Sequence, residues 1–368
     1  MKKSVLLLTI FIFSITQSAF AIDFEDAIFP ELATSGRALA MGNAYVSKAD
    51  DASSVFYNPA GLGTIRNTHF HLSNFHFEVN KGLLSSGTGG AISNASKNVT
   101  KMFSLDGTRQ VLKNNVGKIA HSRFHMLPNF TSRYFSFGYL LAKRTRAVVT
   151  DPLLSTGFEY ADRFDHGPYA ALNISLFGGI FKAGISTIFL NRKELIGKAD
   201  PAATLSVGSN SYQKGNAFIS TAGGKITLPI VFLPTFSATL HNALKQDFKN
   251  GGSVGVPAAI KQSIDVGFSV TPQIGNSSRI HFEVDYKDLS NQFSDVAASR
   301  KLLLGMELDL SRIFFIRAGY GDGFGSFGLG VKSQKIEFDI TTYAVDTTSA
   351  SFRGHEDRRF ALSLSSGF

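Results

Sequence analysis

The chain has 368 residues, a formal net charge of +9, 35 glycines and 34 phenylalanines, but no cysteine and no tryptophan. The lack of cysteine excludes disulfides, thiol chemistry, zinc–thiolate sites and a lipoprotein anchor. The positive charge is dispersed without a dense Lys/Arg block, which argues against a nucleic-acid partner.

The first 21 residues have the pattern of a secretory signal peptide. Lys2 and Lys3 precede an almost unbroken apolar run, and an A-x-A cleavage pattern ends at Ala21. Such a segment is too short and wrongly flanked for a membrane helix. No later run reaches the roughly 18 apolar residues of a membrane helix. We therefore expect residues 1–21 to be removed, leaving a periplasmic, secreted or β-barrel protein.

Residues 22–63 differ from the remainder, because no alternating strand pattern appears before Thr68. Asp50 or Asp51 can cap a short helix. Pro59 disfavours a helical conformation for the residue before it, so this helix should end by Tyr57. We expect a separate N-terminal unit with short helices.

Residues 279–286 set the interpretation of the rest of the chain. Apolar and charged or titratable residues alternate strictly there, in the order Arg279, Ile280, His281, Phe282, Glu283, Val284, Asp285, Tyr286. Successive strand residues face opposite sides, so one face is apolar and the other polar. An apolar outside and a polar inside are typical of a transmembrane β-barrel.

Similar runs recur along the chain. They lie at residues 68–77, 129–142, 169–177, 181–190, 218–227, 230–240, 264–270, 302–310, 314–320, 326–331, 336–343 and 359–368. With residues 279–286 these make thirteen runs. Closed single-chain barrels prefer an even strand number, so we expect one more strand within residues 145–160. The fold class is therefore all-β: an antiparallel barrel of about fourteen strands over residues 64–368, with an N-terminal unit over residues 22–63.

The longest polar interruption covers residues 85–122. Val99, Met102 and Phe103, and later Leu112, Val116 and Ile119, recur at helical spacing. Two hypotheses stay open: a loop with one or two short amphipathic helices that caps one end of the barrel, or a mobile surface loop.

The last strand carries a signal of its own. Phe360, Leu362, Leu364 and Phe368 alternate with small residues. As an ordinary edge strand it would expose a long apolar edge that is prone to aggregate, whereas closure of a barrel leaves no free edge. The terminal Phe368 resembles the signal by which outer-membrane barrels engage the barrel-assembly machinery.

Two groups of motifs resemble the FadL-like outer-membrane transport proteins, and within them the PorV-type branch. The N-terminal group is SGRALAMGNA at 35–44, DDAS at 50–53 and YNPAGL at 57–62, and the C-terminal group is GME at 305–307, RAGY at 317–320 and GLG at 328–330. After Asp339 the family continues Tyr-Ala, whereas this chain has Ile340 and Thr341. The resemblance implies fourteen strands, a Gram-negative outer-membrane location, and residues 22–63 as a plug inside the barrel. Its plug motif would be Asn58, Pro59, Ala60 and Gly61.

The polar strand faces predict the lining of the lumen. The candidates are His69, His71, Arg279, His281, Glu283, Asp285, Glu307 and Arg317. Glu307 and Arg317 flank a tight turn and are placed to pair across a hairpin, either steering a ligand or lining the wall. We expect His69 and His71 to line a wet lumen and not to bind metal, since further ligands are not evident.

The sequence does not predict an enzyme or a cofactor. A G-x-G-x-x-G match at residues 323–328 precedes a strand, so it lacks the helix N-terminus that would bind a pyrophosphate. Neither a G-x-x-x-x-G-K-[ST] phosphate loop nor an H-E-x-x-H zinc motif is present.

Pro229 and Pro234 interrupt the apolar run at residues 228–236. Proline cannot donate to a strand ladder, so it belongs at kinks, edges or ends. The resemblance implies sideways ligand release beside a kinked strand, and these prolines are candidates for that kink. The competing interpretation is a strand that ends at Pro229.

The leading functional hypothesis is an outer-membrane channel, surrounded by lipid, that binds or passes hydrophobic small molecules resembling long-chain fatty acids. The first alternative is a PorV-type barrel that docks secretion partner proteins. The second is a structural or adhesive barrel.

Overall fold

The computed structural model describes residues 22, 24, 27–65, 68–88, 104–275, 277–333, 335–348 and 352–367. The predicted signal peptide and the predicted insertion signal at Phe368 lie outside these residues.

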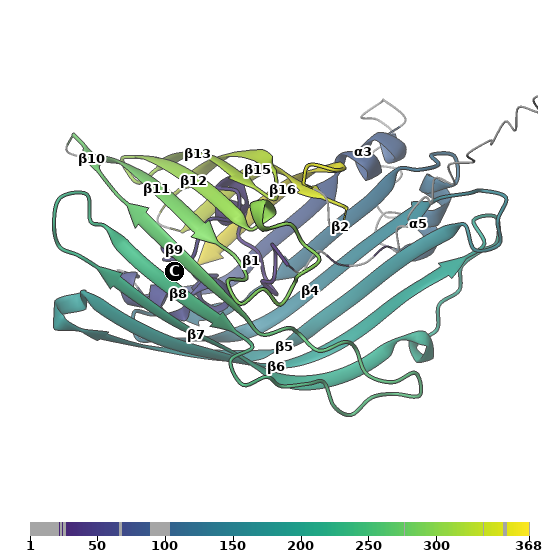
Figure 1. Ribbon diagram of the computed structural model, residues 1–368, viewed down its shortest axis with the longest axis horizontal. Coiled ribbons are helices and arrows are strands. Elements are labelled where there is room, and N and C mark those ends of the chain that lie inside the picture. The colour runs from purple at the N-terminus through teal and green to yellow at the C-terminus, as the bar shows by residue number, and fades with distance from the viewer. Residues whose placement is uncertain are drawn as a thin grey trace, which may run out of the picture.

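The chain forms a closed antiparallel β-barrel of fourteen strands (Figure 1). The strands are β1 (His69–Asn80), β2 (Ile119–Met126), β3 (Asn129–Thr131), β4 (Phe135–Val149), β5 (Phe158–Leu176), β6 (Phe181–Ala199), β7 (Gln213–Thr227), β8 (Thr235–His241), β9 (Ser263–Val270), β10 (Gln273–Ile274), β11 (Ser278–Tyr286), β12 (Leu302–Leu310), β13 (Phe314–Gly321), β14 (Phe324–Lys332), β15 (Ile336–Asp346) and β16 (Glu356–Gly367). Strands β2 and β3 share one wall position between β1 and β4, and β10 only lengthens the hairpin before β11. Pairing of β1 with β16 and of β9 with β11 closes the ring.

The alternating pattern faces the way the sequence predicts. On β11, Phe282 and Val284 are 43% and 42% exposed, whereas Glu283 and Asp285 are 2% and 0% exposed. Apolar side chains therefore cover the outside of the cylinder, and charged side chains point into it. The predicted barrel class and strand number are confirmed.

One strand assignment is wrong although the total is right. Residues 145–160 hold no separate strand, because they are the end of β4, a turn and the start of β5. The strand that was not predicted is β2, which overlaps the end of the segment interpreted as loop, residues 85–122, and continues beyond it to Met126. Its outward positions include Ala120 and Ser122, so the apolar half of the alternation is weak there.

An N-terminal segment, residues 27–65, lies inside the ring of strands and is drawn in purple in Figure 1. We call it the inner segment. Its helices are α1 (Gly36–Ala40), α2 (Ser54–Tyr57) and the 3₁₀ helix η1 (Pro59–Thr64). Helix α2 ends at Tyr57 as predicted, because Asn58 is extended and Pro59 begins the next turn. The Asp51 side chain does not cap α2. Its Oδ1 accepts from the N–H of Ser53 at 2.8 Å, and Ser53 is the residue before the first residue of the helix.

Glycines in the wall let the inner segment come close. A Cβ added at Gly319 of β13 would lie 2.1 Å from the carbonyl carbon of Met41, and one at Gly184 of β6 would lie 2.4 Å from that of Pro59. Backbone therefore packs directly on backbone at both places.

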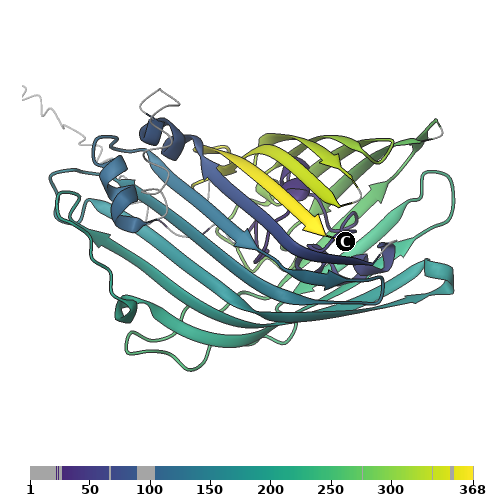
Figure 2. The ribbon, with the colours of Figure 1, turned by 180° about the vertical axis from the view of Figure 1, so that it is seen from behind.

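The helices α3 (Lys81–Thr88) and α5 (Leu105–Leu112) do not cap the barrel. They pack in one cluster with Val79, Ala147, Val149 and Phe158, which occupy the outward positions of the wall. Figure 2 shows both helices at the end where the long strands β4 to β6 project. The expectation of a cap is therefore wrong for the described helices. Among the residues that the structure describes, no helix is both long enough and apolar enough to cross a membrane.

The predicted proline kink is also in a different place. Pro229 and Pro234 lie in the turn between β7 and β8, where Leu228 N donates to Pro234 O at 3.0 Å. The wall is interrupted instead at Leu127 and Pro128, between β2 and β3. The expectation of a kinked strand at Pro229 and Pro234 is wrong, since both residues join two strands.

Candidate functional site

Two cavities lie in the lumen on opposite sides of the inner segment. The long-loop cavity has a volume of about 730 Å³ and reaches loop residues such as Ala258 and Thr347. The short-turn cavity has a volume of about 870 Å³ and reaches turn residues such as Ile313 and Lys335. The inner segment contributes to the lining of both, so it separates one half of the lumen from the other.

The long-loop cavity is lined by apolar side chains together with charged side chains of both signs. Its apolar lining comes from the inner segment and from the wall, and includes Ile28, Leu32, Val55, Phe56, Ile188 and Ile219. Arginines from β4 to β6 border it, namely Arg144, Arg146, Arg163 and Arg192. A cavity of this size and lining suits a hydrophobic small molecule.

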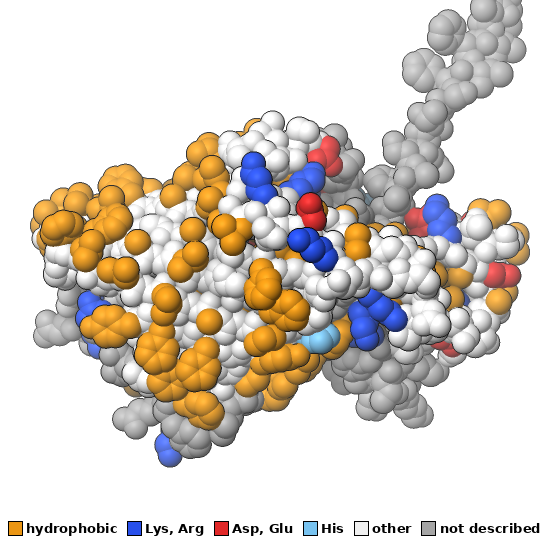
Figure 3. Space-filling view, turned by 90° about the horizontal axis from the view of Figure 1, so that it is seen from below, with side chains coloured by type: hydrophobic (Ala, Val, Ile, Leu, Met, Phe, Trp, Pro, Cys, Tyr) orange, Lys and Arg blue, Asp and Glu red, His pale blue; other side chains and the backbone are white. Residues whose placement is uncertain are grey.

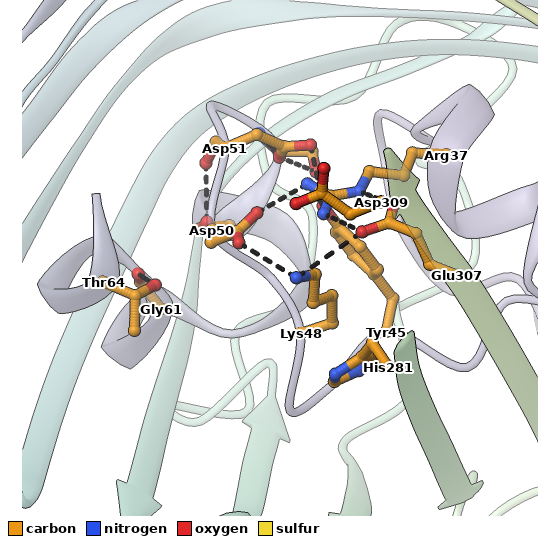
Figure 4. Close-up of polar contacts among 12 residues, drawn as sticks. Arg37, Tyr45, Lys48, Asp50, Asp51, Gly61, Thr64, His281, Glu307 and Asp309 are labelled. Carbon is orange, nitrogen blue, oxygen red and sulfur yellow. Dashed lines mark hydrogen bonds and ion pairs between the residues drawn. The ribbon is translucent and has the colours of Figure 1, made fainter. Parts of the chain in front are cut away.

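An ionic cluster joins the inner segment to the barrel wall at β12 (Figure 4). Arg37 of α1 donates from Nε and Nη2 to the two carboxylate oxygens of Glu307 on β12, each at 2.6 Å, and from Nη1 to Asp50 at 2.6 Å. Lys48 Nζ lies 3.5 Å from both Asp50 and Glu307. Glu307 also accepts from Arg317 Nε at 2.7 Å. Each buried charge thus has an opposite charge beside it.

The environment of this cluster shifts two pKa values in the inner segment. Burial alone would raise the pKa of Asp50, but the charges of Arg37 and Lys48 outweigh burial and hold it well below its ordinary value. Burial raises the pKa of Tyr45 well above its ordinary value, against the opposing charge of Arg37. At neutral pH the Asp50 carboxylate is therefore ionised and the Tyr45 phenol neutral.

Carboxylates of β11 hold the backbone of the inner segment. Asp285 Oδ2 accepts from the N–H groups of Tyr45 and Val46 at 2.6 and 2.8 Å, and Glu283 Oε1 accepts from Ser47 N at 2.5 Å. These N–H groups lie in a turn that leaves them without strand partners, so the wall carboxylates satisfy them. The predicted lumen pair Glu283 and Asp285 thus contacts the inner segment rather than open water.

The motif at residues 58–61 is fully buried. Asn58 caps η1 by accepting from Ala60 N at 3.1 Å, and its amide donates to Val46 O at 3.0 Å. Pro59 fits the first turn of η1, where no N–H is needed. A Cβ added at Gly223 of β7 would lie 2.1 Å from Asn58 Oδ1, so the wall is glycine where the motif touches it.

The other predicted lumen residues lie in different surroundings. His281 bonds to Glu283 at 3.0 Å and to Thr271 at 2.8 Å, and Arg279 lies 3.4 Å from Asp309. His71 contacts Asn129 at 3.2 Å and borders the short-turn cavity. The side chain of His69 lies outside the described part of the chain.

A second polar cluster, which was not predicted from the sequence, lies on β1 and β2. His76 and His125 stack with ring centroids 4.5 Å apart, and Glu78 accepts from His121 at 2.6 Å. His125 Nε2 also bonds to the carbonyl of Thr34 in the inner segment at 2.8 Å. Within the described ranges, no three His, Asp or Glu side chains are arranged to hold a metal ion. The period-2 spacing of His121, Arg123 and His125 was the available signal, and only its first residue lies in the segment interpreted as loop.

An apolar cluster connects the long-loop cavity with the break in the wall. Phe56 and Ile188 line that cavity, and they belong to the same buried cluster as Leu62, Leu127 and Leu140. Leu127 is the first residue of the break between β2 and β3. Leu140 lies on β4 beside this break, since its neighbour Leu141 pairs with β2 and Gly138 pairs with β3. Pro128 cannot donate to β1, so this part of the wall has fewer ladder bonds.

Comparisons with known proteins identify the fold. No protein-family model matches the sequence, and a search of curated proteins gives no match. Among solved structures, a deltaS2 mutant of the TodX monoaromatic hydrocarbon channel matches with a TM-score of 0.54 and 10% identity, covering 91% of this chain and 99% of that chain. The CymD monoaromatic hydrocarbon channel matches with a TM-score of 0.52 and 9% identity, covering 92% and 99%. A Pseudomonas aeruginosa FadL homologue matches with a TM-score of 0.46 and 10% identity, covering 92% and 99%.

These similarities span almost the whole of this chain and of each channel. At such low identity the TodX and CymD matches establish the architecture alone: a fourteen-strand barrel like those of these two channels. The class of the fold is thus shown, whereas the ligand and the partners are inferred from the residues of this chain.

Proposed function

We propose that this protein is an outer-membrane channel for hydrophobic small molecules, with the inner segment as its plug. The observation that carries the proposal is the apolar cluster that joins the long-loop cavity to the break between β2 and β3. A hydrophobic molecule would leave water in the cavity and follow apolar side chains to the wall. The TodX and CymD neighbours are named as monoaromatic hydrocarbon channels, which supports the same class of cargo.

The break at Leu127 and Pro128 is the proposed lateral exit. In the structure the cluster is closed, since Leu127 is 1% and Leu140 0% exposed. Passage would therefore need side-chain movement or local displacement of β3, which has only three residues. Release into the membrane would keep a hydrophobic cargo out of water on the far side of the inner segment.

The apolar part of the long-loop cavity would hold the cargo. Long-chain fatty acids and monoaromatic hydrocarbons are the two proposed classes, because both are hydrophobic and could lie against its apolar lining. Asn58, Pro59, Ala60 and Gly61 would form the constriction.

Uptake by cells tests the proposal. The chain is expressed in a Gram-negative host without its own channel of this type, and uptake of radiolabelled oleate and toluene is measured. A cavity-filling substitution, Ala142→Trp, should reduce uptake at least tenfold because Ala142 lines the long-loop cavity. The matched control is Ala170→Trp on the exposed outer face of β5, which should leave uptake unchanged. Equal uptake with and without the chain would reject the proposal.

A second function, docking of secretion partners, has one observation in its favour. The ionic cluster and the β11 carboxylates pack the inner segment firmly against the wall, as expected of a barrel that conducts nothing. Proteins that co-purify with the gently extracted barrel, together with absent uptake, would favour this PorV-type role over the channel.

A further inference from the structure

The outer wall of β4 to β7 carries a row of lysines at one level. Lys143 on β4 lies opposite Phe164 on β5, Phe164 lies opposite Lys193 on β6, and Lys193 lies opposite Lys214 on β7. Alternate residues of a strand share a face, and the exposed Phe137 and Leu172 share the parity of Lys143 and Phe164. The four side chains therefore sit side by side on the outside of the barrel.

The lysine row, residues Lys143, Lys193 and Lys214, marks the border of the exposed apolar surface. Toward the short turns, Phe189 and Phe218 pair with ring centroids 4.9 Å apart, and Phe218 is 57% exposed. Toward the long loops, the outward-facing apolar side chains are instead buried beneath α3 and α5. Figure 3 shows orange side chains concentrated toward one end of this face, and blue basic with some red acidic side chains toward its middle and other end. Lipid contact thus has to end at this row.

Little negative charge opposes these lysines. Asp162 lies 3.7 Å from Lys143, and its carboxylate also accepts from Thr145 at 2.5 Å and from Tyr212 at 3.0 Å. Lys214 donates to Ser209 Oγ at 3.1 Å. Among the residues that the structure describes, Asp162 is the one carboxylate that pairs with the row. The row therefore keeps most of its positive charge for a ligand outside the protein.

We propose that the lysine row binds the phosphate groups of lipid headgroups in the outer leaflet of the membrane. Lysine stems lie along apolar surface while their ammonium groups reach into the polar region above it. Phosphates at the headgroup level supply the complementary charge, and Phe164 between the lysines offers apolar contact to the acyl side. The inference rests on the proposed membrane location but is independent of any cargo.

Native mass spectrometry of the purified full-length protein in detergent tests it, with bis-phosphorylated lipid A as the probe. The triple variant Lys143→Gln, Lys193→Gln and Lys214→Gln should bind the probe on the order of 100-fold more weakly, roughly fivefold for each lysine. The corresponding triple substitution to Arg should keep the affinity within about threefold. A matched control substitutes three exposed loop lysines, Lys113, Lys118 and Lys245, with Gln and should bind like the unmodified protein.

Three outcomes would overturn the inference. They are undiminished binding by the Gln triple variant, equal binding of fully dephosphorylated lipid A, and binding of inorganic phosphate with the same affinity as the lipid. Should the triple variant fail to assemble, as shown by circular dichroism, Lys193→Gln alone should still lose about fivefold. Lipid binding without uptake of oleate or toluene would reject the channel and leave the lysine row standing.

Discussion

Arg37 of the inner segment and Glu307 of β12 form a two-pronged salt bridge between residues that are 270 positions apart. Arg37→Met would leave Glu307 with Arg317 and Lys48, while Asp50 would lose its shortest contact. Because partners remain, we expect a loss of about 2 to 3 kcal/mol in the docking of the inner segment, less than for an isolated buried charge. Amide hydrogen exchange at Tyr45 should accelerate roughly 30- to 150-fold.

The control for this prediction is Arg279→Met. Arg279 also faces the lumen, but it lies 3.4 Å from Asp309 and its side chain is 30% exposed. A pair of this kind contributes about 1 kcal/mol or less. Exchange at Tyr45 should change less than about fivefold in this variant. Equal acceleration in both variants would contradict a specific role for Arg37.

The low pKa of Asp50 predicts how docking of the inner segment depends on pH. A carboxylate with a depressed pKa stabilises the folded state fully above its ordinary value of 3.8, and the contribution declines as pH falls below that value. Protease resistance of the inner segment should therefore be constant from about pH 8 to pH 5 and decline below about pH 4. Asp50→Asn should remove this acid step. A loss of protease resistance between pH 7 and pH 5 would contradict the assignment of this step to Asp50.

Glycine at position 319 permits the contact between β13 and the inner segment. In Gly319→Val the new Cβ would lie 2.1 Å from the carbonyl carbon of Met41, which is a steric clash. Neither the backbone of β13 nor that of the inner segment can shift to relieve it without losing other contacts. We expect displacement of the inner segment at a cost of about 1 to 3 kcal/mol, seen as higher single-channel conductance in planar bilayers. In the control Gly325→Val, the nearest atom to the new Cβ would be 3.9 Å away, and conductance should not change.

How far the sequence predicts this structure depends on the period of each pattern. The alternation at residues 279–286 predicts both the strand β11 and the residues that face the lumen. Side chains of a strand alternate between two faces, so once the apolar face is assigned to lipid the polar face must point inward. The pattern of residues 85–122 predicts short amphipathic helices. It cannot tell whether their apolar face covers the mouth of the barrel or, as found, its outer wall, since both surfaces are apolar partners.

The site was less predictable, because it is made by contacts between distant segments. Glu307 and Arg317 could be paired from the hairpin, but Arg37 and Asp50 come from the inner segment. A lone arginine among the small residues 35–42 was the available signal for a buried ion pair. The position of the kink was wrongly predicted for a related reason. Pro229, Pro234 and Pro128 all interrupt apolar runs, and only the pairing with neighbouring strands distinguishes a turn from a break in one strand.

The break beside Pro128 gives the sharpest test of lateral release. Since the chain has no cysteine, two cysteines can be introduced selectively. Phe70 and Phe130 are directly opposite each other on β1 and β3, so a disulfide between Phe70→Cys and Phe130→Cys would fix β3 to β1. If β3 must move for cargo to leave, oxidation should reduce uptake of oleate at least roughly tenfold, and dithiothreitol should restore it.

The matched control places the disulfide on the other side of the break. Phe77 and Phe124 are directly opposite each other on β1 and β2, so Phe77→Cys with Phe124→Cys forms the same cross-link without restraining β3. Uptake by this variant should be the same under oxidising and reducing conditions. Equal inhibition in both variants would mean that the barrel must deform as a whole. Undiminished uptake in both would rule out release beside β3, because a fixed β3 keeps the ladder next to Pro128 closed.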